Sequence, residues 1–280
     1  MSANRSAAVA LTIAGSDCSG GAGLQADLKT FGAFDVYGLT AVTCVVAEVP
    51  GRVSRIDPVD PVNLTRQIEL CFASFPIGAV KTGLLYSTQN VVLVSELLGR
   101  LAPVIPLVID PVMVATSGDT LLQPEAIALY QTQLFPQASL ITPNLSEAAV
   151  LTSQPIRDLE QMRSAGIQLA RQFGTRILIK GGHLSGELAI DLLCDAEGIE
   201  EFAAPRIPGF STHGTGCTYS AAITAALARG NSLREAVGQA KEFVSRAIRD
   251  HFCWSNSSGE IQALNQVQAD SIRERRNPDS

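Results

Sequence analysis

Short apolar segments alternate along the chain with longer segments in which apolar residues recur every three or four positions. The short segments cover residues 7–15, 39–49, 77–83, 106–113, 139–144 and 176–182. Their near-continuous apolar content is typical of strands buried on both faces of a parallel sheet, whereas the periodic segments are typical of amphipathic helices. The alternation therefore predicts an α/β domain with a doubly wound, mostly parallel sheet.

The periodic segments predict five helices, over residues 23–34, 61–75, 90–101, 124–135 and 158–173. Residues 188–195 and 199–207 predict a β-hairpin that turns around Ala196–Gly198. Two more helices are predicted near 215–229 and over 232–251. Apolar density falls after Trp254, so we expect one domain over residues 1–253 and a polar, marginally ordered tail over 254–280.

The composition narrows the class of protein. The chain has 280 residues, 46% of them hydrophobic, and a net charge of −6, which favours one large, acidic domain. Basic residues cluster only in the tail, at Arg273, Arg275 and Arg276, which argues against a nucleic-acid partner. We expect no signal peptide and no membrane-spanning segment. The six cysteines lack metal-like spacing and are expected to be reduced, in a cytosolic protein.

The segment GSDCSGGAGLQADLKT, residues 15–30, follows the first predicted strand and opens a helix. One interpretation is a tight strand-to-helix turn, which needs glycine. The other is a loop whose backbone a flat ligand approaches, beside Ser16, Asp17 and Asp27. The segment has neither the GxGxxG nor the GxxxxGK[ST] spacing, so it predicts neither a NAD-dependent oxidoreductase nor a P-loop enzyme.

The segment STHGTGCTYSAAITAAL, residues 211–227, carries the strongest chemical signal. Gly214, Thr215 and Gly216 precede a helix of small residues, so the backbone N–H groups and the helix dipole are expected to form an anion hole. Such a hole stabilises the charge on a transferred phosphoryl group. Cys217 falls in the first turn, where we expect a lowered thiol pKa and a role as proton acceptor. The alternative is an ordinary glycine-capped helix.

Polar residues follow three other predicted strands. Asp110 ends the apolar run PLVID, Asn144 and Glu147 lie in TPNLSEA, and Lys180 ends RILIK. Asn144 and Glu147 are compatible with simple helix capping. Functionally, Asp110 and Glu147 are candidates to hold Mg²⁺ through water, and Lys180 is a candidate to contact phosphates. Parallel strands bring such residues to one edge of the sheet.

These segments, in this order, resemble the hydroxymethylpyrimidine and hydroxymethylpyrimidine-phosphate kinases of thiamin biosynthesis, which are ribokinase-like proteins. The stretches that carry the resemblance are LTIAGSDCSGGAGLQADLKTF, VKTGLL, DPVMVATSG, LITPNLSEA, IKGGH and THGTGCTYSAA, within about residues 8–250. The resemblance implies a three-layer α/β/α sandwich, a homodimer, and ATP- and Mg²⁺-dependent phosphorylation of a ring hydroxymethyl group. In bifunctional members the monophosphate is phosphorylated as well.

The resemblance also implies roles for individual residues. Gly15, Asp27 and Val112 line the pyrimidine site. Asn144 and Glu147 form an NxxE element that orders Mg²⁺ and phosphate. The residues implied around the ATP phosphates are Lys180, Thr212, Gly214 and Gly216. Cys217 stands where most sugar-phosphorylating relatives carry an aspartate base.

Two positions depart from the family pattern. Glu48 stands where the family commonly has glutamine, and Leu84 stands where it commonly has methionine. Glutamine offers a donor and an acceptor to an aminopyrimidine edge, whereas an ionised glutamate offers only acceptors. We therefore hypothesise that Glu48 binds the ring by sharing a proton with it, helped by burial that raises the pKa of its carboxyl.

Two other functions are compatible with the fold. Pyridoxal or pyridoxine kinase is the first, because that ring also bears a hydroxymethyl group. Pyridoxal-using relatives can carry a second cysteine on the segment after DPVMV, where this chain has Ala115, and the flanking segment to Gly118 resembles the pyrimidine kinases better. The second is a non-catalytic pyrimidine-binding protein, which would be expected to have lost the anion hole or the NxxE element; neither is damaged here.

Overall fold

A nine-stranded sheet forms the centre of the computed structural model, which describes residues 7–113, 124–182, 184–210, 213–256 and 259–267. Its strands, in spatial order, are β3 (Arg52–Pro58), β2 (Val36–Val49), β1 (Ala8–Asp17), β4 (Ile77–Thr82), β5 (Leu107–Ile109), β6 (Leu140–Ile141), β7 (Arg176–Ile179), β8 (Leu188–Cys194) and β9 (Ile199–Pro205). The strands from β2 to β7 are parallel, while β3, β8 and β9 join antiparallel. The predicted, mostly parallel sheet is confirmed.

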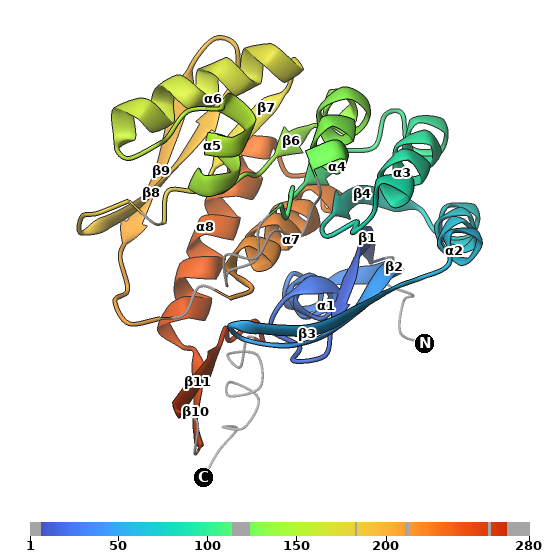
Figure 1. Ribbon diagram of the computed structural model, residues 1–280, viewed down its shortest axis with the longest axis horizontal. Helices are drawn as coiled ribbons and strands as arrows, with labels where there is room; N and C mark the ends of the chain where they lie inside the picture. The colour runs from blue at the N-terminus through green and yellow to red at the C-terminus, as the bar shows by residue number, and fades with distance from the viewer. Residues whose placement is uncertain (1–6, 114–123, 183, 211–212, 257–258, 268–280) are drawn as a thin grey trace, which may run out of the picture.

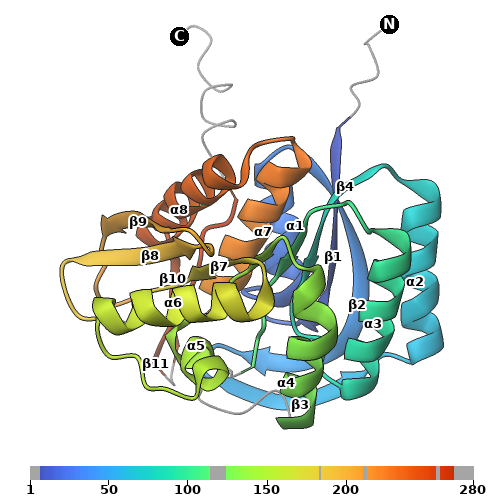
Figure 2. The ribbon, with the colours of Figure 1, turned by 90° about the horizontal axis from the view of Figure 1, so that it is seen from above.

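Helices cover both faces of the sheet (Figures 1 and 2). One face packs against α1 (Gly23–Ala33), α7 (Thr215–Ala228) and α8 (Leu233–Arg249). The other packs against α2 (Pro61–Ser74), α3 (Thr88–Leu101), α4 (Pro124–Leu129), η1 (Tyr130–Leu134), η2 (Phe135–Gln137), α5 (Leu145–Thr152) and α6 (Leu159–Phe173). Each interface buries a separate apolar core, so the three-layer sandwich is confirmed. Within the described residues, no helix combines the length and the apolar character needed to cross a bilayer.

β5 and β6 are much shorter than the predicted strands over 106–113 and 139–144. Asp110 and Pro111 follow β5, and Thr142 and Pro143 follow β6. Proline has no backbone N–H to donate to a neighbouring strand, so the chain leaves the sheet at these points. The polar residues that follow β5 and β6 therefore lie at the carboxyl edge of the sheet, outside the strands.

Two elements were absent from the sequence prediction. The first is β3, whose exposed and charged residues lack the apolar run of a central strand because β3 is an edge strand. The second is a hairpin of β10 (Phe252–Asn256) and β11 (Gly259–Ala263), which lies below α8 in Figure 1.

The tail expected from residue 254 must be corrected. Trp254 lies within β10, and after the hairpin Leu264 and Gln266 are 3% and 1% exposed. The sequence lost apolar density there because this segment is held largely by backbone pairing and side-chain hydrogen bonds. The packed chain therefore continues to at least Gln266. Residues 268–280 of the predicted tail lie outside the described residues.

Candidate active site

The first turn of α7 lies at the carboxyl edge of the sheet. Gly214 caps this helix with φ +78°, and a Cβ on Gly214 would lie 1.9 Å from the carbonyl oxygen of Gly21. Only glycine fits both the left-handed backbone and this close approach. The N–H groups of the first turn have no partner within the helix, and they lie at the positive end of its dipole. The predicted anion hole thus has the backbone it requires.

Lys180 lies beside this turn. A Cβ on Gly216 would lie 3.1 Å from Lys180 Nζ, so glycine lets the ammonium group approach the helix. Lys180 Nζ donates to Asp110 Oδ1 at 2.9 Å, and Ser220 Oγ donates to Asp110 Oδ2 at 3.3 Å. Burial alone would lower the pKa of Lys180, but Asp110 and Glu147 outweigh it and raise the pKa. Lys180 is therefore a fixed positive charge next to the first turn of α7.

Asn144 and Glu147 form a capping box at the start of α5. Asn144 Oδ1 accepts from the Glu147 N–H at 2.9 Å, and Glu147 Oε2 accepts from the Asn144 N–H at 2.8 Å. Glu147 Oε1 also accepts from the Met113 N–H at 3.2 Å. Burial, followed by the nearby Asp110 carboxylate, raises the pKa of Glu147 despite the opposing effect of Lys180. The capping interpretation is confirmed, and a ligand-binding role stays a prediction.

Asp110 and Glu147 are the carboxylates predicted to hold Mg²⁺. They interact electrostatically with each other and with Lys180, and both are nearly inaccessible, at 3% and 2% exposed. In the described part of the chain, no group of three or more His, Cys, Asp and Glu residues has metal-binding geometry. Mg²⁺ in nucleotide sites keeps several waters and uses one or two carboxylates together with phosphates. The pair fits a hydrated ion that arrives with ATP, and does not fit a permanent protein-only site.

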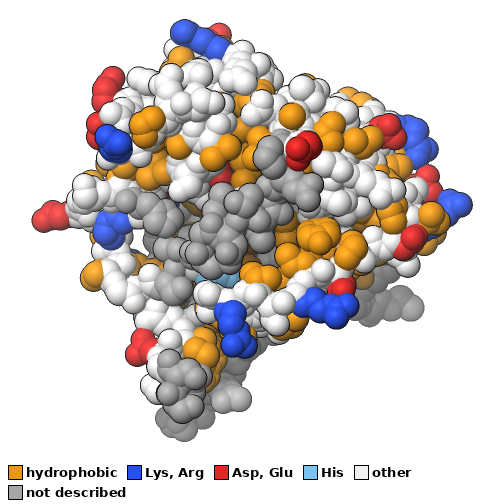
Figure 3. Space-filling view, viewed as in Figure 1, with side chains coloured by type: hydrophobic (Ala, Val, Ile, Leu, Met, Phe, Trp, Pro, Cys, Tyr) orange, Lys and Arg blue, Asp and Glu red, His pale blue; other side chains and the backbone are white. Residues whose placement is uncertain are grey.

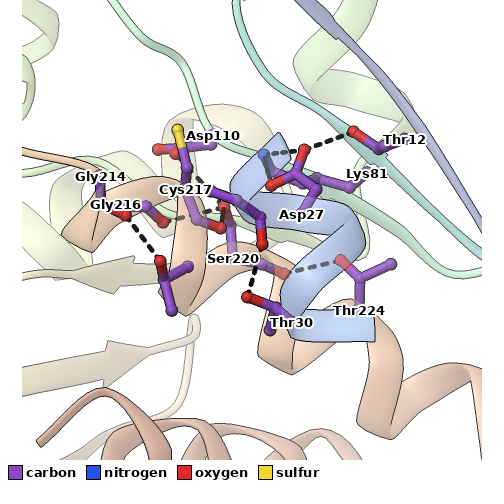
Figure 4. Close-up of polar contacts among 12 residues, drawn as sticks. Thr12, Asp27, Thr30, Lys81, Asp110, Gly214, Gly216, Cys217, Ser220 and Thr224 are labelled. Atoms are coloured by element: carbon purple, nitrogen blue, oxygen red, sulfur yellow. Dashed lines mark hydrogen bonds and ion pairs between the residues drawn. The ribbon is translucent and has the colours of Figure 1, made fainter. Parts of the chain in front are cut away.

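Cys217 lies on the first turn of α7, between Asp110 and the pair formed by Asp27 and Lys81 (Figure 4). Burial raises the pKa of its thiol to about 11, and Asp110 and Asp27 add to that effect. The Lys81 ammonium and a hydrogen bond from the backbone of Gly23 act in the opposite direction but are outweighed. The predicted lowering of the thiol pKa is therefore wrong for the free protein, because burial and two carboxylates exceed the helix-terminus effect.

Lys81 is a functional candidate that sequence reasoning missed. Its side chain is wholly buried, and Nζ donates to Asp27 Oδ1 at 2.7 Å and to Oδ2 at 2.8 Å. Thr12 Oγ1 donates to Asp27 Oδ2 at 2.6 Å. Burial would lower the pKa of Lys81, but Asp27, Cys217 and Asp110 raise it, so the ammonium stays charged. A lone lysine inside the apolar run IGAVKTG was the available signal, because a buried charge needs a partner.

The residues predicted to line the pyrimidine site have different surroundings in the structure. Gly15 lies close to Leu84, since a Cβ on Gly15 would be 3.5 Å from Leu84 Cδ2. Val112 has a positive φ of 44°, a strained conformation of the kind that is concentrated at ligand sites. Asp27 is 0% exposed and engaged by Lys81, which makes its carboxylate a supporting group and not an open contact surface.

Glu48 lies at a register shift of β2, opposite β3, and is partly buried. It interacts with Asp17 and His213: burial raises the pKa of Glu48, Asp17 adds to this effect, and His213 opposes it. His213 Nε2 lies 3.3 Å from Asp17 Oδ2. Burial would raise the pKa of Asp17, but hydrogen bonds from His213, Ser19 and Ala22 lower it to about 2. Asp17 and His213, which sequence reasoning left unassigned, thus set the charge near Glu48.

Some predicted positions lie outside the described residues. They are Thr212, which was predicted beside the ATP phosphates, and the segment from Ala115 to Gly118. On the face shown in Figure 3, blue and red side chains are spread around the rim among white and orange ones.

The fold and this geometry define an α/β phosphotransferase, with a helix N-terminus, a lysine and two carboxylates gathered at one sheet edge. The sequence matches the phosphomethylpyrimidine kinase family over residues 17–262, and the chain belongs to that family. It is 42% identical over 242 residues to the hydroxymethylpyrimidine/phosphomethylpyrimidine kinase of Rhizobium meliloti, covering 86% of this chain and 90% of that protein. It is 40% identical to the thiamine biosynthesis bifunctional protein of Geobacter sulfurreducens over 85% of this chain, and spans 49% of that longer protein.

Solved structures of two kinds are similar to this chain. The phosphomethylpyrimidine kinase of Clostridium difficile is 38% identical with a TM-score of 0.76, covering 86% of this chain and 99% of that one. An ADP complex of Bacillus subtilis pyridoxal kinase is 36% identical with a TM-score of 0.83, covering 93% and 98%. The ribokinase-like fold and kinase activity are supported by both. Backbone similarity does not favour the pyridoxal alternative, because both ring chemistries use this fold.

Proposed function

We propose that this chain phosphorylates the hydroxymethyl group of 4-amino-5-hydroxymethyl-2-methylpyrimidine, and then the resulting monophosphate, with ATP and Mg²⁺. The observation that supports this proposal most strongly is the first turn of α7. There Gly214 lets the carbonyl of Gly21 approach the backbone closely, and Gly216 does the same for Lys180. Family membership and the curated pyrimidine-kinase relatives support the substrate class. The kinase names of these relatives argue against a non-catalytic binding protein.

Each group at the edge has a distinct task in this proposal. The N–H groups of the first turn of α7, near Gly214 and Gly216, stabilise the charge on the transferred phosphoryl group together with Lys180. Asp110 and Glu147 are the residues that would hold Mg²⁺, through its waters. The bound ion would supply positive charge to the phosphates and offset the Asp110 carboxylate. Gly15, Leu84, Glu48 and Val112 orient the ring.

Cys217 is proposed to accept the proton of the attacking hydroxyl. Its thiol is neutral at pH 7 in the free protein, because its pKa is raised to about 11. The sulfur can therefore accept a proton only when it is a thiolate. Lys81 and the Gly23 N–H favour this ionised form. A loose phosphoryl-transfer transition state makes only a modest demand on the base, since the hydroxyl loses its proton late.

A substrate comparison tests the proposal most directly. Hydroxymethylpyrimidine, its monophosphate, pyridoxine and pyridoxal are supplied separately with Mg²⁺-ATP, and ADP release is measured. We expect turnover of the two pyrimidines at higher kcat/KM than of either pyridine. Turnover of pyridoxal alone would assign the chain to the pyridoxal alternative. Turnover of the free alcohol without its monophosphate would remove the second phosphorylation from the proposal.

Glu48→Gln tests how the ring is held. Burial and Asp17 raise the pKa of Glu48, so its proton is retained to a higher pH than in an ordinary glutamate. If the protonated carboxyl binds the ring, the KM for hydroxymethylpyrimidine rises as the pH passes upward through that raised pKa. Glutamine keeps a donor and an acceptor at every pH, so this variant should lose the pH dependence of KM.

The matched control for this experiment is Glu96→Gln, the same substitution on α3. A KM whose pH dependence is equal in Glu48→Gln and in the unaltered protein would show that Glu48 does not share a proton with the ring. Asp17 and His213 lie near this position and influence Glu48 electrostatically, so the KM for ATP is followed over the same pH range. A parallel change in both KM values would assign the pH dependence to those groups instead.

We also propose that the chain is a homodimer that works in the cytosol without nucleic acid or membrane. The homodimer rests on the family resemblance. A cytosolic location is consistent with six cysteines that are all free and with the net charge of −6. Sedimentation at micromolar concentration tests the proposed stoichiometry.

A further inference from the structure

The segment after the terminal hairpin returns to the active-site edge. Leu264 is buried, and the Asn265 N–H donates to Ala247 O at 3.2 Å, which attaches the segment to α8. Gln266 follows and is 1% exposed. A cavity of about 300 Å³ nearby is lined by the hairpin, by the glycine loop, residues 19–21, and by the turn between β2 and β3. The hairpin and the active-site loops therefore meet in one place.

Gln266 bonds to both sides of a close backbone contact. Its Nε2 donates to Gly21 O at 3.1 Å, on the glycine loop, and to Thr218 Oγ1 at 2.9 Å, on α7. Thr218 Oγ1 in turn donates to Gly214 O at 2.8 Å. Gly21 O is also the atom that a Cβ on Gly214 would overlap. One side-chain amide thus joins the glycine loop to the helix cap that forms the anion hole.

The glycine loop connects this contact to the ring side of the site. The Ala22 N–H donates to Asp17 Oδ2 at 2.7 Å, and Asp17 lies beside His213 and influences Glu48. The Gly23 backbone hydrogen-bonds the sulfur of Cys217. Movement of Gly21 away from α7 would therefore displace groups on the phosphate side and on the ring side together.

We propose that Gln266 is a positioning residue for phosphoryl transfer, whose amide holds the glycine loop against the first turn of α7. The proposal rests on the proposed function, in which that turn is the anion hole. Gln266 acts through Gly21 and Thr218 and has no contact with the reacting atoms. A displacement of about 1 Å in a catalytic group can cost up to roughly a hundredfold in rate, so loosening this contact should reduce kcat.

Gln266→Met tests the proposal, because methionine has a similar shape and no donor. We expect kcat to fall about tenfold while the KM for ATP changes less than about twofold, since the anion hole acts mainly in the transition state. Amide hydrogen exchange should become faster in peptides that cover residues 15–25 and 213–222, and remain unchanged in α6. Gln168→Met, at an exposed position on α6, is the matched control.

A second comparison uses the acceptor of the same hydrogen bond. If Gln266 acts through Thr218, the variant that combines Thr218→Val with Gln266→Met should lose less than the sum of the two single losses. Gln266→Asn, which keeps an amide but is too short to reach both partners, replaces the methionine variant if that variant does not fold.

Three outcomes would overturn the proposal. They are an unchanged kcat per folded molecule, a change in KM alone, and exchange that accelerates only in the hairpin or uniformly over the chain. A protein that phosphorylates neither pyrimidine would contradict the proposed function instead. The exchange measurement would then still show whether Gln266 joins the two segments.

Discussion

Cys217→Ala is expected to reduce kcat by about 10²- to 10⁴-fold, which is the range that general base catalysis contributes. The KM for ATP should change little, because the backbone N–H groups and Lys180 remain in place. Activity is measured with saturating Mg²⁺-ATP and hydroxymethylpyrimidine. Cys71→Ala, a partly buried cysteine on α2, is the matched control and should retain full activity.

The pH profile distinguishes a base from a group that only packs against substrate. The pKa of Cys217 is raised to about 11, above the ordinary thiol value, so its thiolate fraction grows as the pH rises toward that value. We therefore expect kcat, measured at saturating substrate, to increase with pH from neutral to mildly alkaline conditions in the unaltered protein. The residual activity of Cys217→Ala should not show this increase. An unaltered kcat in Cys217→Ala would remove this residue from the base role.

Lys81→Met is expected to lower the free energy of unfolding by roughly 3–5 kcal/mol, the usual cost of leaving one member of a buried ion pair alone. Asp27 is wholly buried, and its two oxygens lie 2.7 and 2.8 Å from Lys81 Nζ. Without the ammonium group, the Thr12 hydroxyl is the only side-chain hydrogen-bond donor left to this carboxylate among the described residues. Chemical denaturation with urea measures the loss.

The double variant Lys81→Met with Asp27→Asn should recover more than half of that loss. Asparagine is neutral, keeps nearly the same shape, and still accepts a hydrogen bond from Thr12. Arg55→Met, which breaks the exposed pair with Asp57, is the control and should hardly move the urea midpoint. Equal losses in the single and double variants would mean that packing, and not the unpaired charge, causes the destabilisation.

Loss of Lys81 should also affect catalysis. The ammonium group favours the thiolate of Cys217, so its removal should raise the pKa of that thiol further. The folded fraction of Lys81→Met should consequently have a lower kcat, and its pH profile should shift to higher pH. The same lysine would therefore stabilise the fold through Asp27 and favour the thiolate of Cys217, the proposed base.

Much of the architecture followed from the hydrophobic pattern alone. Parallel strands such as β1 and β4 are buried on both faces, so their apolar runs are unmistakable, and the hairpin of β8 and β9 was placed by its turn residues. The hydrophobic pattern did not predict β3 or the hairpin of β10 and β11, because their residues are largely exposed or polar. Backbone hydrogen bonds hold these strands, and such bonds leave no apolar pattern in the sequence.

The candidate site was predictable only in part, for an equally physical reason. Spacing and residue type pointed to Asp110, Lys180 and Cys217, because each follows a strand or opens a helix. The same spacing could not supply the balance of charges around the Cys217 sulfur. Cys217 lies on α7, whereas Asp27 lies on α1 and Asp110 follows β5. Burial and these two carboxylates together raise the thiol pKa, which reverses the expected direction.

The sequence by itself determined the doubly wound sheet, the family and the glycine-opened helix with Cys217 in its first turn. These depend on local periodicity and on motifs in which neighbouring residues act together. Only the tertiary structure decided that Lys81 is the partner of Asp27, and that Gln266 bonds to Gly21, 245 residues earlier. Both contacts join segments far apart in the chain. Their geometry exists only once the sheet has brought its strand ends to one edge and the terminal hairpin has packed beside them.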